Sequence, residues 1–132
     1  MKIDEKQIQR YKFLQTLYEL VDGNSNYIIN LNEINNLLQW DDDAIHNVYH
    51  YLHEEGLVEG RTLGGNISIT HKGIIEYEAT QNIPEKSTEH FSSNIYNILN
   101  IQNVNNSQIQ QGTERSSQKQ TNIRMIIKFM LN

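Results

Sequence analysis

Apolar residues recur at helical spacing near the start of the chain. In the segment EKQIQRYKFLQTLYELVDG they occupy every third or fourth position, at Phe13, Leu14, Leu17, Leu20 and Val21. This spacing places them on one side of an α-helix. Gly23 follows, and glycine is favoured where a helix ends in the left-handed conformation. The pattern predicts an amphipathic helix that ends just before Gly23.

Two further stretches carry the same period. In YIINLNEINNLLQW, a short β-prone run precedes apolar positions at Leu31, Ile34, Leu37 and Leu38. Asn30, with Glu33 three residues later, is an asparagine variant of the capping box. In DDDAIHNVYHYLHEEG, three aspartates suited to a helix N-terminus precede apolar positions at Ile45, Val48, Tyr49 and Leu52. These stretches predict a short second helix and a third helix that ends near Glu55.

The third predicted helix has a polar face opposite Ile45 and Leu52. At about 100° per residue, this face consists of Asp43, Asn47, His50 and Glu54, with His46 and His53 at its margins. These are the side chains that the helix offers to a partner.

The segment GLVEGRTLGGNISITHKG predicts a β-hairpin followed by a helix. The Gly64-Gly65 pair suits a two-residue turn, with Leu63 opposite Asn66 and Val58 opposite His71. One face then carries Val58, Thr62, Ile67 and Ile69, and the other carries Glu59, Arg61, Asn66, Ser68 and Thr70. Thr70 can cap a last helix, which ends before Pro84.

This order of elements resembles the winged helix-turn-helix domain of bacterial regulators. The resemblance lies where the third helix enters the first strand, at Leu52, Gly56, Leu57 and Val58, and where the second strand enters the last helix, at Ile67, Ser68, Ile69, Thr70 and Gly73. It covers about residues 5–82. It implies an α+β fold with a winged helix-turn-helix domain over residues 1–82, and double-stranded DNA as a partner. Winged helices also serve as protein-interaction modules, so the resemblance is more specific for fold than for ligand.

Residues 83–93 are polar and without periodicity, which predicts a linker. Residues 94–118 are rich in Asn, Gln and Ser, yet carry aliphatic residues at Ile95, Ile98, Ile101, Val104 and Ile109. A disordered tract is one interpretation, but the regular aliphatics favour short strands with a turn near Gly112. The segment resembles a motif of the pattern NIxNVxNSxIQQGT found in diverse bacterial proteins, some of them linked to defence against phage. These few aliphatic residues bury too little apolar area for residues 94–118 to be stable alone. We therefore expect an oligomerisation motif that uses Ile98, Ile101, Val104 and Ile109.

The final stretch, residues 119–132, places Ile123, Ile126, Ile127 and Met130 at helical spacing. It predicts a short amphipathic helix that is marginal alone and packs between subunits. A membrane-surface anchor is the alternative, because Phe129 and Leu131 add apolar area beside Arg124 and Lys128. Buried packing is the commoner fate of such a stripe, so a homo-oligomer is expected and a membrane partner is not.

The net charge of -5 is spread unevenly along the chain. Residues 1–82 carry 6 Lys+Arg and 13 Asp+Glu, whereas residues 83–132 carry 5 and 3. The chain has no cysteine, which excludes disulfides and thiolate metal sites. No stretch approaches the roughly 20 apolar residues of a membrane span, and the N-terminus lacks a signal-peptide pattern. These features predict a cytoplasmic protein.

Histidines of the third helix are the candidates for metal chemistry. His46 and His50 are four residues apart, so both could face one cation, and Glu54 is four residues beyond His50; this geometry permits a two-point site. The sequence supplies no further ligand such as cysteine, and exposed histidines on a solvated face are common, so we expect no metal and no cofactor. No nucleophile motif or phosphate-binding loop is present, which argues against an enzyme.

Nucleic-acid binding is the function that the resemblance implies. Asn47 could bind adenine through two hydrogen bonds, while His50 and His46 could donate to a base edge or a phosphate. Arg61 and Asn66 could reach phosphates from the hairpin.

The charge of the third helix opposes this interpretation, because DNA affinity depends on Lys and Arg and the polar face of the helix has neither. Asp43 and Glu54 would meet phosphates as like charges. The sequence therefore predicts a non-enzymatic regulator or adaptor that binds nucleic acid as an oligomer, with an acidic protein-interaction module as the alternative.

Overall fold

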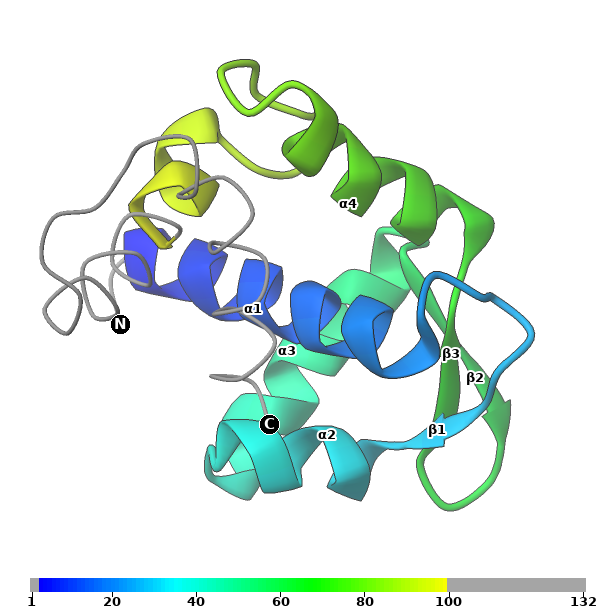
Figure 1. Cartoon of the computed structure of the whole chain (residues 1–132). Helices are drawn as coiled ribbons and strands as arrows, with labels where there is room; N and C mark the ends of the chain where they lie inside the picture. The colour runs from blue at the N-terminus through cyan, green and yellow to red at the C-terminus, as the bar shows by residue number, and fades with distance from the viewer. Residues whose placement is uncertain (1–2, 100–132) are drawn as a thin grey trace, which may run out of the picture.

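The computed structural model describes residues 3–99 of the chain. Figure 1 shows a group of helices with a small sheet at one side, which confirms the α+β fold class. In chain order the elements are α1 (Ile3–Val21), β1 (Ile29–Asn30), α2 (Leu31–Leu38), α3 (Asp42–Glu54), β2 (Val58–Thr62), β3 (Asn66–Ile69) and α4 (His71–Asn82). A further short helix occupies residues 93–99.

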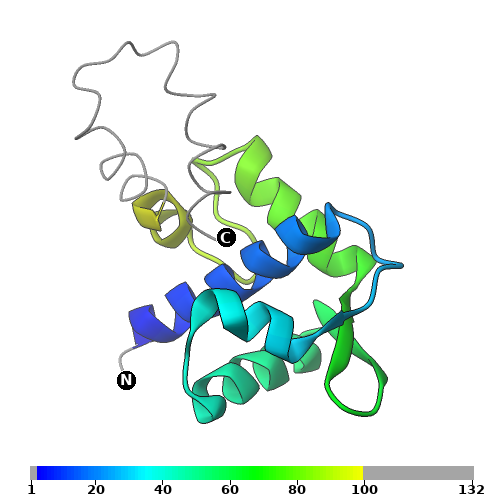
Figure 2. The same ribbon diagram turned by 60° about the horizontal axis from the view of Figure 1, so that its bottom comes forward.

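α1 is the central element of the core. It packs against α2, α3, α4 and β3, and Figure 2 shows the other helices arranged around it. Leu14 and Leu17 of α1, Ile34 of α2 and Leu52 of α3 have no exposed surface. These are positions that the helical period assigned to apolar faces. After Val21 the chain leaves the helix through Gly23, whose φ of 70° is one that glycine adopts without strain, as predicted.

Side-chain caps begin three of the helices. The Asn30 side chain accepts a hydrogen bond from the backbone N–H of Asn32, and the Asp41 side chain accepts one from Ala44. Thr70 Oγ1 accepts from Gly73 N at 3.0 Å. Caps of this kind satisfy N–H groups that have no partner inside the helix. The predicted caps at Asn30 and Thr70 are confirmed.

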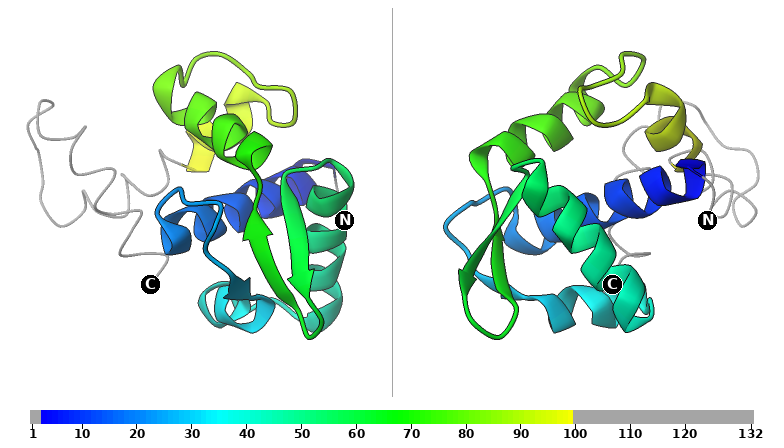
Figure 3. Two further views of the ribbon diagram at one scale, coloured as in Figure 1. Left: turned by 90° about the vertical axis from the view of Figure 1, so that its right-hand side faces the viewer. Right: turned by 180° about the vertical axis from the view of Figure 1, so that it is seen from behind.

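The sheet is antiparallel with strand order β1-β3-β2, and the β2–β3 hairpin extends from the helices (Figure 3). Its register differs from the prediction: Val58 pairs with Ile69 rather than with His71, and Gly60 pairs with Ile67. Two features together cause the shift: the turn has three residues, 63–65, because Thr62 pairs with Asn66, and a β-bulge between Gly60 and Thr62 leaves Arg61 unpaired.

Beyond the bulge the shift is two residues and preserves the face of each side chain, so Val58, Ile67 and Ile69 are buried together as expected. Two residues of the strands differ from the predicted faces. Ser68 is fully buried, because β3 is the central strand. Thr62 is exposed instead of sharing the buried face.

The segment after α4 differs from the expected linker and strands. Residues 93–99 form a helix, and Phe91, Ile95 and Tyr96 are buried in the core. Tyr96 stacks on Tyr11 of α1 with ring centroids 5.7 Å apart, and Phe91 meets Tyr11 edge-on at 5.3 Å. The hydrophobic core therefore extends through residue 99 rather than ending at residue 82.

The helix over residues 93–99 replaces the strand expected from residue 94. One turn of this helix places both Ile95 and Tyr96 in the core. Where the helix begins, the Ser92 hydroxyl accepts a hydrogen bond from Asn94 N at 3.2 Å. Ile98, predicted as an oligomerisation residue, lies on this helix and is 45% exposed. The predictions for Ile101, Val104, Ile109, Ile123, Ile126, Ile127 and Met130, and for the helix over 119–132, lie outside the described residues.

Candidate functional site

The exposed side of α3 is the candidate functional surface. Ile45, Val48 and Leu52 are buried against the body of the protein. The opposite side is exposed to solvent, and we call it the α3 outer surface: Asp42, Asp43, His46, Asn47, His50, His53 and Glu54. This arrangement follows from the period of the sequence, since buried residues three and four apart leave the intervening ones outside.

Three of the predicted nucleic-acid contacts lie on this surface. Asn47 is exposed, and its side chain makes no hydrogen bond with the described residues. The His50 ring lies 5.6 Å from the Tyr49 ring. The His46 Nδ1 atom lies 2.8 Å from the Asp42 carbonyl oxygen, one helical turn earlier.

The two predicted contacts from the hairpin are engaged elsewhere. Arg61 Nη1 lies 3.8 Å from a Glu59 carboxylate oxygen and donates to Ser68 Oγ at 3.3 Å. The Asn66 carboxamide accepts from Asn30 Nδ2 at 3.0 Å and donates to Thr62 Oγ1 at 2.7 Å. These partners position both side chains along the hairpin, while the guanidinium of Arg61 keeps further N–H groups that no described residue accepts.

The charge of the α3 outer surface is negative. Asp42, Asp43 and Glu54 are exposed, and the surface contains no lysine or arginine. Arg10 of α1 is not available to it either, because the guanidinium carbon lies 3.5 Å from the centroid of the Tyr51 ring, a cation–π contact. The surface therefore suits a cationic partner better than a polyanion.

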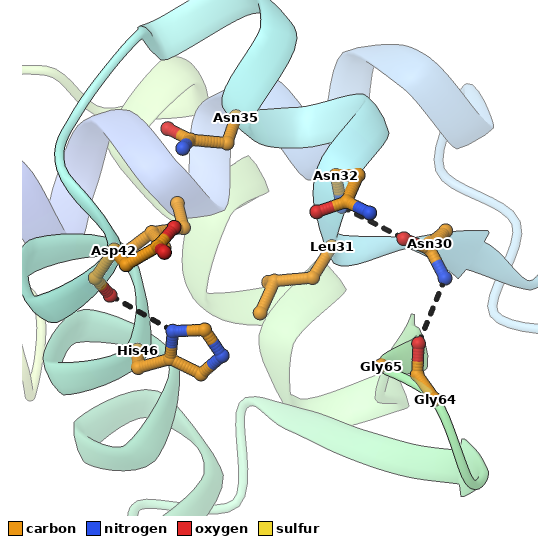
Figure 4. Close-up of a pocket in the computed structure, with 9 residues that line it drawn as sticks. Asn30, Leu31, Asn32, Asn35, Asp42, His46, Gly64 and Gly65 are labelled. Carbon is orange, nitrogen blue, oxygen red and sulfur yellow. Dashed lines mark hydrogen bonds between the residues drawn. The ribbon is translucent and has the colours of Figure 1, made fainter.

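A polar pocket of about 140 Å³ opens between the start of α2, the start of α3 and the turn of the β2–β3 hairpin (Figure 4). It is lined by Asn30, Leu31, Asn32, Asn35, Asp42, Ile45, His46, Gly64 and Gly65. The Asn30 carboxamide ties these elements together, since it donates to Gly64 O at 3.0 Å and accepts from Asn32 N at 2.9 Å. The pocket thus joins the α3 outer surface to the hairpin turn.

A second titratable cluster lies behind α3, around His90. The His90 side chain is 4% exposed, with Nδ1 at 3.1 Å from Glu76 Oε1 and Nε2 at 2.8 Å from Glu55 Oε1. Neutral imidazole donates from one nitrogen only, so both contacts are satisfied when the ring carries two protons. Burial alone would lower the pKa of His90, but hydrogen bonds to Glu76 and Glu55 outweigh it, and the pKa lies above its ordinary value.

The Glu76 carboxylate is the buried partner in this cluster. It accepts hydrogen bonds from the backbone N–H and the ring of His90. Burial alone would raise its pKa, but hydrogen bonds from Thr88 and His90 outweigh this effect and lower the pKa. Both groups are therefore held in their charged forms and tie residues 88–90 to α4 and α3.

The cluster also bears on the question of a metal. Within residues 3–99, metal-type donor atoms gather within 4.8 Å at Glu76, Glu89 and His90, and not at His46, His50 and Glu54 of α3. Both ring nitrogens of His90 already donate hydrogen bonds, Nδ1 to Glu76 and Nε2 to Glu55.

Sequence reasoning missed the pocket and the His90 cluster for the same reason. Each is built from residues of three segments, and helical or strand periods relate residues within one segment only. Asn30 was identified as a cap, but its bond to the hairpin gave no sequence signal.

Within the part of the chain that the structure describes, no helix has both the length and the apolar character needed to cross a bilayer. Comparison of the chain with protein-family models, with curated proteins and with solved structures found no match.

Proposed function

We propose that this chain is a non-enzymatic winged-helix adaptor or regulator whose α3 outer surface binds a basic protein partner. The single observation that carries the proposal is the charge of this surface. Asp42, Asp43 and Glu54 are exposed on it, and Arg61, the cation of the adjoining hairpin, is paired with Glu59. Complementary charge accelerates encounter and disfavours partners of like charge.

The order of elements supports the winged-helix part of the proposal. α2 and α3 follow one another with a short connection, and the β2–β3 hairpin comes directly after α3. β1 joins the hairpin as a third strand beside β3. In a winged helix-turn-helix domain α3 occupies the position of the recognition helix and the hairpin that of the wing.

Self-assembly and location complete the proposal. Ile98 is 45% exposed at the end of the described chain, where the aliphatic residues of the Asn/Gln-rich segment begin. An oligomer would strengthen a weak individual contact through avidity. We keep the bacterial cytoplasm as the proposed location.

DNA binding is the second candidate, and a specific observation favours it. Asn47 is exposed near the middle of α3 with its carboxamide unbonded to the described residues, as base reading would need. The deficit of cations on the same surface makes it the weaker candidate.

Site-specific crosslinking of the full chain in its host cells separates the two candidates. A photoreactive amino acid replaces Asn47 on α3, and in a matched control it replaces Asn82, an exposed asparagine at the end of α4. We expect a discrete protein adduct from position 47 and none from position 82. Adducts from both positions or from neither would contradict the proposal, and a nucleic-acid adduct from position 47 would favour DNA.

A titration with labelled duplex DNA gives the complementary result. We expect no saturable binding even at low salt, because the surface offers no cation to displace counterions from phosphates. Saturable binding that falls steeply with salt and weakens in Arg61→Ala would establish the DNA-binding alternative.

A further inference from the structure

The polar groups of the pocket that have no partner are predominantly acceptors. The Asp42 carboxylate and the Asn32 carboxamide make no side-chain hydrogen bond with the described residues. His46 adds a third acceptor. Its Nδ1 atom faces the Asp42 carbonyl oxygen at 2.8 Å, and a carbonyl only accepts, so Nδ1 carries the proton. In the tautomer that carries only this proton, Nε2 is an acceptor.

The donors of the pocket, in contrast, are mostly occupied, although the Nδ2 group of Asn32 makes no bond with the described residues. Asn30 donates to Gly64 O and to Asn66 Oδ1 at 3.0 Å each. The Asn35 carboxamide is taken up by the backbone of Trp40, donating to its oxygen and accepting from its nitrogen at 2.9 Å each. A ligand that fits this pocket must therefore supply donors.

The walls of the pocket have room for a flat group with an apolar stem. Leu31 and Ile45 form its apolar lining, and both are nearly fully buried. Gly64 has a positive φ of 88°, and a Cβ there would meet nothing within 4 Å. The volume of about 140 Å³ corresponds to roughly five water molecules at liquid density. This space accommodates a guanidinium group and the end of its stem.

We propose that this pocket binds the guanidinium group of an arginine from the partner protein. The inference rests on the proposed function, because it names the anchor of the basic partner on α3. Guanidinium carries five donors and no acceptor, and its planar fork pairs with a carboxylate such as Asp42. The methylene stem lies along Leu31 and Ile45.

Two helix N-termini border the pocket, and their dipoles alone would favour an anion. Their partial charge is already offset by the side-chain caps of Asn30 and Asp41. An anion would also face the Asp42 carboxylate with few free donors. The acceptor-rich lining therefore decides in favour of a cation.

The probe for this site is N-acetyl-arginine amide, titrated into the isotope-labelled full chain and followed by NMR. We expect saturable shifts at the backbone amides of Gly64 and Gly65 and at the Asn32 side-chain amide. N-acetyl-norleucine amide, which has a stem without charge, should leave these signals unchanged. N-acetyl-lysine amide should bind more weakly, because ammonium has three donors and no planar fork. Equal shifts with the norleucine or lysine probe would overturn the assignment.

A pair of aspartate variants provides the matched control. Asp42 and Asp43 are both exposed in the first turn of α3, but Asp42 lines the pocket and Asp43 does not. Asp42→Asn should weaken binding of the arginine probe about fivefold, whereas Asp43→Asn should change it less than about twofold. His46→Ala, which removes the Nε2 acceptor, should also weaken it. Equal effects of the two aspartate variants would mean that net charge alone attracts the probe, and the pocket assignment would be wrong.

The outcome is separable from that of the proposed function. A protein crosslink at position 47 together with an inert pocket would refute the arginine site alone. A pocket selective for arginine without a protein crosslink would refute the proposed partner surface alone.

Discussion

Replacement of His90 by alanine tests whether residues 83–99 belong to the folded domain. The His90 imidazole is 4% exposed and bridges Glu76, whose side chain is 6% exposed, to Glu55, which is 40% exposed. Removing one member of a buried ion pair costs about 3–5 kcal/mol. The contact with the more exposed Glu55 adds little, and Glu76 keeps the hydrogen bond from the backbone N–H of residue 90. We therefore expect His90→Ala to lower the free energy of unfolding by about 3 kcal/mol.

Urea denaturation followed by the fluorescence of Trp40, the only tryptophan, measures this loss. With a urea dependence of about 1–3 kcal/mol per molar for a small domain, the midpoint should fall by roughly 1–3 M. His71→Ala is the matched control, because His71 is an exposed histidine at the start of α4, and it should change stability by less than about 0.5 kcal/mol.

A midpoint shift in His90→Ala no larger than in the control would refute the reasoning. It would mean that the segment around His90 contributes nothing to global stability. A double-mutant cycle with Glu76→Gln then isolates the pair, and a coupling energy near zero would locate any loss outside the ion pair.

Three further predictions use the same assay. The contribution of His90 to stability should be full below about pH 6.5 and should fall as the pH rises through the raised pKa of His90. The contribution of Glu76 should be lost on acidification through its lowered pKa. His90→Ala should flatten the alkaline limb of the stability profile, and a retained limb would contradict the assignment. Gly73→Ala should destabilise by about 3 kcal/mol, because its Cβ would lie 2.2 Å from the Leu57 carbonyl oxygen; wild-type stability would show that this contact relaxes freely. Asn30→Ala should cost about 1–2 kcal/mol, as it removes a helix cap and the bonds to the hairpin turn, and a loss below about 0.5 kcal/mol would disprove that role.

The elements up to α4 were predictable because their signals are local. Ile45, Val48 and Leu52 recur with the helical period, and Asn30 and Thr70 are short polar side chains at helix starts. The register of the hairpin was not predictable in the same way. The bulge before Thr62 depends on how β2 fits β3 and the body of the protein, and an even shift leaves the alternation of the sequence unchanged.

The helix at residues 93–99 could not be predicted from the spacing of apolar residues alone. Its seven described residues span less than two turns, too few for a clear period. Isoleucines spaced by three in an asparagine-rich stretch suit a helix and a loosely ordered strand almost equally. The deciding contact is the stacking of Tyr96 on Tyr11, two residues far apart in the sequence. Of the predicted site, the residues on α3 lie together as expected. Arg61 contacts Glu59 and Ser68, which the hairpin pattern placed on the same face, whereas the bond from Asn30 to Asn66 had no sequence signal.

The position of residue 99 determines how copies of this domain can be arrayed. α1 lies between α3 and the helix at 93–99, so the described chain ends on the side of α1 away from α3 (Figure 2). Subunits that joined through this side of α1 would hold their α3 outer surfaces on the periphery of the assembly. Each subunit would add one outward-facing pocket, and a partner with repeated basic side chains would engage several at once. The valency of binding would then equal the number of subunits, although no α3 surface takes part in assembly.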